Sequence, residues 1–289
     1  MTELVTGALA PSASKPKASA RWRVRGVSWG ARLSLVFILA SLAVMVLVEY
    51  LPLQDPAQQD LVNTLAPISG EHWIGTDELG RDLFSRLLWG VHTSLLAGLT
   101  AVAVAVGIGL PLGLLAGYLG GWVDQVLSRL ADVVLTVPAL ILLLAAQTAL
   151  DTSIQGQMAV LGCIFAPRVL RVIRAEALGV STAAFVTAGR MSGASHARIL
   201  LRYLLPGVRA QVVVQISYLL GLAMVVEAGI SFLGIGVKPP DSSLGTLLIG
   251  ASALLSSHPH VVLVPAAVLT TLILSLNVFG DSLTEQRKK

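Results

Sequence analysis

The chain contains 289 residues; 55% are hydrophobic, 12% are charged, and the mean hydropathy is +0.79. Soluble globular domains have about a quarter charged residues, so this composition argues against a soluble protein and predicts an all-α bundle of membrane-spanning helices. The net charge of +4 does not indicate a nucleic acid partner, because basic residues in membrane proteins gather in cytoplasmic loops. The single cysteine, Cys163, excludes an intrachain disulfide and a cysteine metal site.

The N-terminal segment, residues 1–30, is expected to be a disordered, basic cytoplasmic tail, because residues 1–20 are rich in Ala, Ser, Pro and Lys. Four arginines then precede the first apolar run, at about residues 33–48, as in a secretory signal. No small-residue cleavage site follows, and further apolar runs come after it. We therefore predict a retained membrane anchor.

Six apolar runs approach or exceed the length that crosses a bilayer, so residues 31–283 are predicted to form a six-span domain. The predicted spans are about 33–48, 94–119, 133–150, 158 onward, 208–237 and 261–279. The polar, acidic stretch at about 49–89 is predicted to be an external loop. Residues 241–260, which include His258 and His260, are predicted to be a re-entrant or surface segment, and these histidines to be interfacial rather than metal ligands.

The basic residues predict the orientation. With both termini in the cytoplasm, 17 of the 20 Lys and Arg residues lie inside, and only Arg81, Arg86 and Lys238 lie outside. Residues 284–289 then form a basic cytoplasmic tail. The arginines near the end of the fourth span are expected to extend toward the inner surface; they are Arg168, Arg171 and Arg174.

One stretch between apolar runs, Phe185–Pro206, is too charged to lie in hydrocarbon. Its period is helical, since Arg198 and Arg202 share one face next to an apolar face. Gly193 is expected to break it into two short helices, and Pro206 to end the second or begin the next. We predict a cytoplasmic helical hairpin at about 183–207 that binds a partner; an ordinary connecting loop is the alternative.

This hairpin resembles the coupling motif of ABC importer permeases, which is Glu-Ala-Ala, three residues, Gly, nine residues, then Ile-x-Leu-Pro. The aligned residues are Thr187-Ala188-Gly189, Gly193 and Tyr203-Leu204-Leu205-Pro206. Thr187 replaces the glutamate, Gly189 the second alanine and Tyr203 the isoleucine. Three further stretches are similar to C-type permeases of the dipeptide, oligopeptide and nickel branch: residues 74–86, 117–124 and 227–240.

The resemblance covers roughly residues 30–283. It implies a type I importer permease in the bacterial plasma membrane that moves di- or oligopeptides or related solutes. It also implies a homologous B-type permease subunit, one or two cytoplasmic ATPase subunits or a fused one, and an external solute-binding protein. The implied ATPase-coupling residues are Thr187, Ala188, Gly189, Arg190, Gly193, Ala194, Ser195, Arg198, Arg202 and Pro206. ATP and Mg²⁺ would bind the partner ATPases, since this chain lacks a phosphate-binding loop, and we expect no catalytic or metal site in it.

Glu227 is the one acidic residue deep in a predicted span, where a carboxylate marks either a transport pathway or a buried polar pair. One interpretation places Glu227 and Ser231 on the substrate path or at a gate. The other gives Glu227 a structural hydrogen bond to a neighbouring helix or partner subunit.

Two other classes of protein compete with the importer. An ion-coupled secondary transporter would use Glu227 as a proton or sodium site and need no ATPase. An intramembrane hydrolase would pair Ser231 with a histidine. The acidic stretch Gly75–Asp82 lacks the spacing of a calcium loop, so we expect Thr76 or Asp77 to cap a helix there, with contact to an external binding protein as a second use.

Overall fold

The computed structural model describes residues 29–150 and 153–287, and every regular element in that part of the chain is a helix. The predicted tail of residues 1–30 lies outside it, except for Trp29 and Gly30, which already belong to α1. The long helices are α1 (Trp29–Leu47), α2 (Leu83–Leu119), α3 (Gly121–Thr136), α4 (Ala139–Leu150), α5 (Ile154–Ser181), α8 (Leu205–Phe232) and α10 (Pro259–Arg287). The short elements are α6 (Ala184–Met191), α7 (His196–Ile199), the π-helical turn η2 (Leu200–Leu204), the 3₁₀ turns η1 (Val48–Tyr50) and η3 (Thr246–Leu248), and α9 (Ala251–Leu254).

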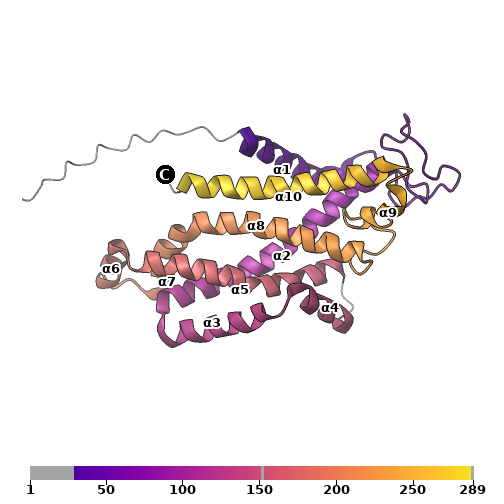
Figure 1. Ribbon diagram of the computed structural model, residues 1–289. Helices are drawn as coiled ribbons and strands as arrows, with labels where there is room; N and C mark the ends of the chain where they lie inside the picture. Colours follow the sequence, from indigo (N-terminus) through magenta and orange to yellow (C-terminus); the bar gives the residue numbers. More distant parts are fainter. Residues whose placement is uncertain (1–28, 151–152, 288–289) are drawn as a thin grey trace, which may run out of the picture.

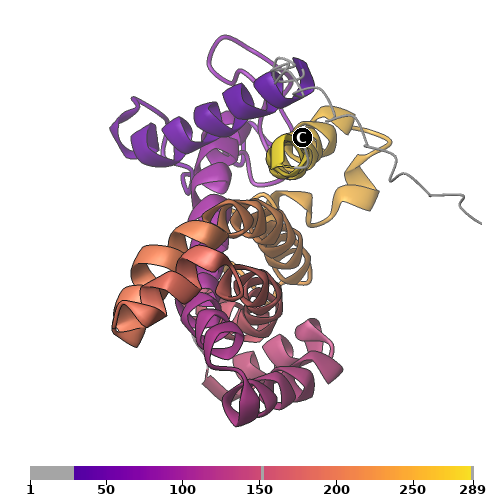
Figure 2. The ribbon, with the colours of Figure 1, turned by 90° about the vertical axis from the view of Figure 1, so that its left-hand side faces the viewer.

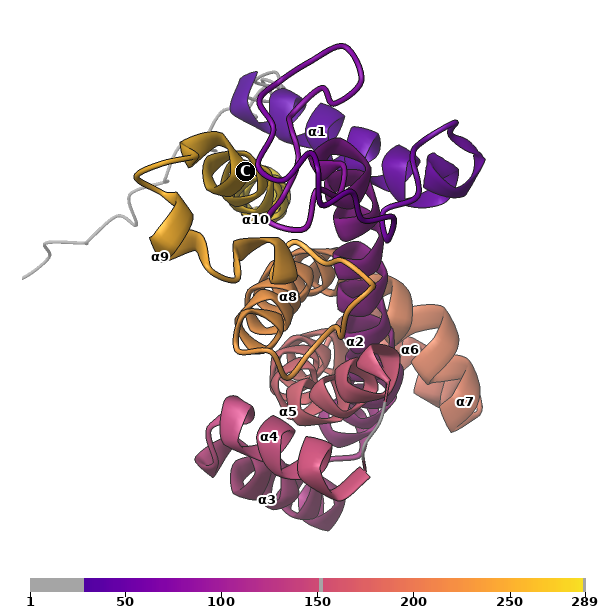
Figure 3. The same ribbon diagram turned by 90° about the vertical axis from the view of Figure 1, so that its right-hand side faces the viewer.

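The helices form three layers (Figures 1 and 2). α2, α5 and α8 lie in the middle, α1 and α10 pack on one side of them, and α3 and α4 pack on the other. α6 and α7 lie at one end, which we call the hairpin end, together with the start of α1 and the end of α10 (Figure 1). The long loop of residues 51–82 and α9 lie at the opposite end, the loop end (Figures 1 and 3).

Four helices of the described chain are long and apolar enough to cross a membrane: residues 29–50, 83–119, 196–232 and 259–283. α3 and α4 together make a fifth candidate that is broken by an 80° bend. α5 is long enough, at roughly 42 Å, but it is not among these candidates because its three arginines lower its hydropathy. The all-helical, multi-span architecture is therefore confirmed. By helix length and composition alone, however, the described chain has four or five candidate spans, not the predicted six.

The helices differ from the predicted spans in two places. α2 begins at Leu83, ahead of the predicted span start near residue 94, because the Asp82 carboxylate accepts a hydrogen bond from the Ser85 N–H at 2.8 Å and caps the helix. The end of the predicted external loop at 49–89 is thus helical. The third predicted span, 133–150, is interrupted because Pro138 holds Val137 in an extended conformation (φ −94°, ψ 131°).

The C-terminal ends of the fifth and sixth predicted spans also differ from the ends of the helices. The fifth span was predicted to reach Val237, but α8 ends at Phe232, where Gly234 adopts φ +75° and terminates the helix. α10 continues to Arg287, so most of the predicted tail at 284–289 is helical, and residues 288–289 lie outside the described chain.

Small residues bring α2 and α5 into the closest helix contact of the fold. A Cβ atom at Gly109 would lie 2.5 Å from the Ala166 carbonyl oxygen, and one at Gly113 would lie 2.8 Å from that of Leu170. Gly117 repeats the pattern one turn later. From the other helix, a Cβ atom at Gly162 would lie 2.5 Å from the backbone oxygen of Ala101. Close backbone approach through small residues is the usual way in which helices associate in lipid, so α2 and α5 form one tightly packed pair.

Gly109→Ala is expected to lower the free energy of unfolding by about 1–3 kcal/mol, the usual cost of overpacking. Gly107 is a matched control in the same helix, because a Cβ atom there meets nothing within 4 Å. Gly107→Ala should be neutral or stabilising by up to about 1 kcal/mol. Thermal unfolding of the purified variants in detergent measures the difference, and equal melting temperatures would contradict the close contact.

Candidate functional site

The hairpin (residues 183–207) has the two-helix form that its sequence predicts. α6 ends at Met191 with Ser192 as its C-cap, and Gly193 turns the chain with φ +75°. The Ser195 hydroxyl then caps α7 by accepting a hydrogen bond from the Arg198 N–H at 3.4 Å. Pro206 lies in the first turn of α8, where the absence of an N–H carries no penalty. The chain therefore leaves α5, makes a tight turn at Gly193 and returns directly into α8.

The predicted coupling residues divide between two faces of the hairpin. The exposed ones are Thr187, Ala188, Arg190, Gly193, Ser195, Arg198, Arg202 and Pro206. Gly189 is buried against the Tyr203 ring of this same chain, and Ala194 is half-buried. Three large apolar side chains, Phe185, Met191 and Leu201, are also exposed on the hairpin, by 54%, 85% and 63%.

The charge on the hairpin has one sign. Residues 177–226 contain no Asp or Glu, and they contain four arginines: Arg190, Arg198, Arg202 and Arg209. All four are exposed. The hairpin thus presents cations and apolar side chains without an acidic group of its own to neutralise them.

The hairpin also contacts the end of α2. The hydroxyl of Tyr118, the penultimate residue of α2, lies 2.9 Å from Nδ1 of His196 in α7. The Arg190 guanidinium of α6 lies 4.8 Å from the centroid of the same ring. Tyr118 was not predicted to be a functional residue, although it lies within the stretch 117–124 that resembles the permeases. Nothing in the local sequence connects it to His196, which is 78 positions away.

Glu227 is completely buried in α8 and hydrogen-bonded through both carboxylate oxygens. The Ser94 hydroxyl of α2 donates to Oε2, and the Ser231 hydroxyl donates to Oε1, both at 2.8 Å. Each serine oxygen in turn accepts a backbone N–H from the loop after α8, from Leu244 at 3.1 Å and from Val237 at 3.2 Å. Glu227 therefore joins α2, α8 and residues 237–244, which is the chemistry of a structural hydrogen bond between neighbouring helices. Within the described chain, the Ser231 hydroxyl bonds to Glu227 and to the Val237 N–H, and not to a histidine.

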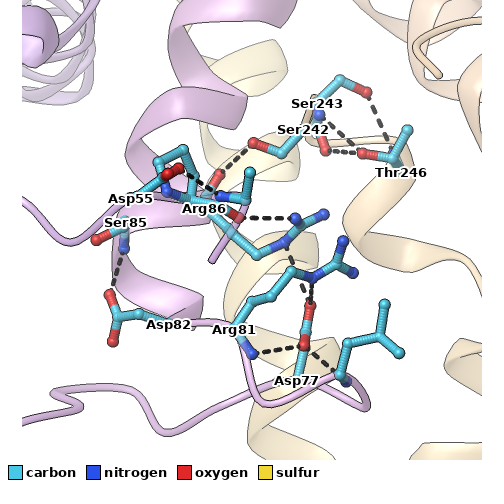
Figure 4. Close-up of polar contacts among 12 residues, drawn as sticks. Asp55, Asp77, Arg81, Asp82, Ser85, Arg86, Ser242, Ser243 and Thr246 are labelled. Atoms are coloured by element: carbon cyan, nitrogen blue, oxygen red, sulfur yellow. Dashed lines mark hydrogen bonds and ion pairs between the residues drawn. The ribbon is translucent and has the colours of Figure 1, made fainter. Parts of the chain in front are cut away.

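A second polar network lies nearer the loop end (Figure 4). Arg86 is 4% exposed; its Nε lies 3.3 Å from Oδ2 of Asp77, and its Nη1 donates to the Pro56 carbonyl at 3.1 Å. Its own carbonyl accepts from the Ser242 hydroxyl at 3.1 Å. Arg81 also pairs with Asp77, at 2.7 Å. The side chain of Arg86 thus contacts two loop segments and its backbone carbonyl contacts a third; Arg86, too, was not predicted from the sequence as a functional residue.

The predicted capping role of Thr76 and Asp77 is wrong. Gly80, at φ +71°, closes a turn after Asp77 and prevents a helix there, so the helix starts six residues later with Asp82 as its cap. Asp77 instead accepts hydrogen bonds from the N–H groups of Leu79 and Arg81. In the same loop, hydrogen bonds from the side chain of Asn63 and the backbone of Val62 lower the pKa of Asp60.

The arginines near the end of α5, which were predicted to extend toward the inner surface, have partners in the described chain, and Arg171 is itself exposed. Arg174 pairs with Asp124 of α3, with Nη2 donating to Oδ2 at 2.6 Å, and Arg171 pairs with Asp132. Arg168 lies over the Phe165 ring at 5.3 Å. The amphipathic helix α3 is therefore attached to α5 by two ion pairs.

The described residues contain no group of three or more His, Cys, Asp or Glu side chains that would suit a metal ion. His258 and His260 lie with ring centroids 6.3 Å apart beside the loop end. A cavity of about 410 Å³ opens at this end between the start of α5, α2 and residues 237–242, and its walls include Asp55, Trp89, His92 and Asp241.

A multi-span helical bundle with a basic hairpin at one end and loop networks at the other has the organisation of a membrane transport subunit. Residues 109–286 match the family model described as binding-protein-dependent transport system inner membrane component, and the chain belongs to that family. It is thus a membrane component of an ABC transport system, as the four sequence stretches suggested. Neither alternative, the secondary transporter or the hydrolase, agrees with this family.

Curated relatives extend the comparison. The glutathione transport system permease protein GsiD of Shigella flexneri serotype 5b is 39% identical over 215 residues, 74% of this chain and 71% of the relative. The dipeptide transport system permease protein DppC of Alkalihalophilus pseudofirmus is 31% identical over 255 residues, 88% and 84% of the two chains. The probable D,D-dipeptide transport system permease protein DdpC of Escherichia coli K12 is 34% identical over 281 residues, 95% and 94% of the two chains.

Ser94→Ala and Glu227→Gln are each expected to lower the free energy of unfolding by about 1–3 kcal/mol, because each leaves a buried polar group without its partner. Backbone amides of residues 241–247 should exchange hydrogen faster in both variants. Ser217→Ala is the control, since Ser217 is also buried in α8 but donates to Val213 in its own helix. Unchanged exchange of residues 241–247 in Ser94→Ala would show that Glu227 does not fix this loop.

Proposed function

We propose that this chain is a six-span permease subunit of an ATP-driven importer of di- or oligopeptides, and that its hairpin is the contact for a separate ATPase. The observation that carries the proposal is the exposed, exclusively basic hairpin, continuous with α5 and α8 and bonded to α2. A partner that displaces this one segment acts on three long helices at once. Residues 1–30 and the C-terminal end are assigned to the cytoplasm with it.

The hairpin has the properties of a docking surface for a protein with an acidic rim. Phe185, Met191 and Leu201 supply apolar contact area, and Arg198 and Arg202 supply charge around it. Complementary charge accelerates association and sets orientation more than it adds affinity. Among the predicted coupling residues, the exposed Thr187, Ala188 and Arg190 extend this surface along α6.

Six crossings follow if the bent pair α3–α4 and the arginine-bearing α5 each count as one span. The ion pairs Asp124–Arg174 and Asp132–Arg171 support this assignment. They neutralise two of the arginines whose charge lowers the mean hydropathy of α5 below that of a typical membrane span. An even number of crossings agrees with the first and last helices having their free ends beside the hairpin (Figure 1). The loop end then faces outward, toward a solute-binding protein.

Peptides are the proposed solutes because the relatives are named for glutathione, dipeptide and D,D-dipeptide transport. The cavity beside Asp55 and Asp241 at the loop end offers an entrance where carboxylates can attract a peptide ammonium group. The path itself is proposed to form against a homologous B-type permease subunit. Glu227 and Ser231 shape that path indirectly, by fixing residues 237–244 next to it.

ATP and Mg²⁺ are proposed to bind in one or two ATPase subunits, or a fused one, and not in this chain. The decisive test is reconstitution of the chain with its B-type partner, ATPase and binding protein in proteoliposomes. L-Ala-L-Ala, D-Ala-D-Ala and glutathione serve as test solutes. ATP-dependent uptake of at least one is expected; uptake without any ATPase, or of none of the three, would contradict the proposal.

Gly193→Trp is expected to leave the protein in the membrane but to abolish most ATP-dependent uptake. A side chain at φ +75° is strained, and the indole would project from the turn into the docking surface. Gly179→Ala, near the end of α5 in open space, is the control and should transport normally. Equal uptake by Gly193→Trp and the unaltered protein would refute the docking role of this turn.

The double variant Arg198→Gln/Arg202→Gln is expected to bind the ATPase roughly tenfold more weakly, mainly through slower association. The difference should shrink at high salt, because exposed charges are screened. Arg32→Gln, an exposed arginine near the start of α1, is the control. Surface plasmon resonance with the complex in nanodiscs measures both; unaltered affinity of the double variant would remove the arginines from the interface.

A further inference from the structure

The hairpin is connected to the bundle in three ways, and only two of them are covalent. It continues from α5 at one end and into α8 at the other. The third connection is to α2, which is distant in sequence: the η2 turn packs against α2, and the Tyr118 side chain makes the polar contacts. A motion of the hairpin can therefore reach α5 and α8 through the backbone, and the Tyr118 ring provides the polar link to the last turn of α2.

Each short helix of the hairpin supplies one contact to the ring. His196 of α7 shares a hydrogen bond of 2.9 Å with the hydroxyl, and its own ring meets Tyr118 edge-on at 5.6 Å. Arg190 of α6 lies over the ring face at 4.8 Å, within the range of a cation–π interaction. The two helices are thus attached to α2 at a common point.

The Tyr118 ring is packed into the hydrophobic core and is only 8% exposed. A cavity of about 370 Å³ borders it and is lined by Tyr118, Leu119, Arg190, Ala194, His196 and Ile199. Beside this cavity, the hydrogen bond to His196 and the contact with Arg190 add direction to the packing of the ring against the hairpin.

The other end of α2 carries Arg86, which holds the loop segments at Pro56, Asp77 and Ser242. α2 is one helix of 37 residues, or roughly 55 Å. Immediately after Tyr118 and Leu119, Gly120 and Gly121 both have positive φ, so the regular helix stops there. Tyr118 therefore occupies the last rigid turn of the element that connects the hairpin end with the loop end.

We propose that Tyr118 is a positioning residue that ties the hairpin to α2, so that ATP-driven displacement of the hairpin moves α2 and the loops attached to Arg86. The inference rests on the proposed function of the hairpin as the ATPase contact. Without the Tyr118 contacts, the hairpin still binds the ATPase, but its movement no longer reaches the loop end efficiently.

The test compares Tyr118→Phe, which removes the hydroxyl, and Tyr118→Leu, which also removes the ring. Each is assembled into the full complex in proteoliposomes with the test solute that the unaltered complex takes up fastest. ATPase binding should be unchanged in both. The ATP hydrolysed per solute taken up should rise roughly fivefold or more in Tyr118→Leu and by less in Tyr118→Phe, as for the loss of a typical coupling energy. Tyr218→Phe, on the exposed side of α8, is the control.

A double-mutant cycle separates a coupling role from a merely structural one. His196→Ala should raise the ratio of hydrolysis to uptake as Tyr118→Phe does, and the double variant should be no worse than either, because both remove the same hydrogen bond. Melting temperatures of Tyr118→Phe and the unaltered protein should agree. If Tyr118→Leu does not fold, this cycle decides alone.

A normal ratio of hydrolysis to uptake in Tyr118→Leu, or additive effects in the cycle, would overturn the positioning role. Failure of the proposed function looks different: the unaltered complex would then bind no ATPase through the hairpin, and Arg198→Gln/Arg202→Gln would bind as tightly as the unaltered protein.

Discussion

Backbone contact between α2 and α5, through glycines spaced four residues apart, is the constraint on which the other features depend. Gly109, Gly113 and Gly117 leave no room for a Cβ atom, so the two helices behave as one body. The hairpin leaves one member of this pair and contacts the other through Tyr118, while Arg86 at the far end of α2 holds the loops. The hairpin end and the loop end are therefore both attached to the α2–α5 pair, so a displacement of the hairpin can be transmitted to the loops.

Charged groups inside the bundle are placed where they connect segments. Glu227 joins α2, α8 and the following loop, and Arg86 joins α2 to three loop segments. A buried ionisable group without partners is strongly unfavourable, so each of these networks favours one arrangement of the loops over all others. A transporter that opens its solute path first to one side of the membrane and then to the other needs at least two arrangements of its helices and loops. Glu227 and Arg86 stabilise the arrangement seen in this structure.

Features that depend on neighbours in the sequence could be predicted, and features that depend on distant partners could not. The hairpin limits, the turn at Gly193 and the position of Pro206 follow from local periodicity and backbone preference. The start of α2 could not be predicted because the positive φ of Gly80 is not visible in a pattern of acidic residues. The break before α4 depends on Pro138, whose local effect is masked by the apolar run around it. The pairing of Arg171 and Arg174 with α3 spans 39 and 50 residues, and no periodicity reveals it.

The ion pairs between α3 and α5 also bear on how the chain enters the membrane. Asp124 and Asp132 leave the ribosome well before Arg171 and Arg174 are synthesised, so for that interval α3 carries two acids without their counter-charges. Unpaired acids make a helix poorly suited to hydrocarbon. The ion pairs that attach α3 to α5 can form only once α5 has been synthesised, when more than half of the chain has been translated.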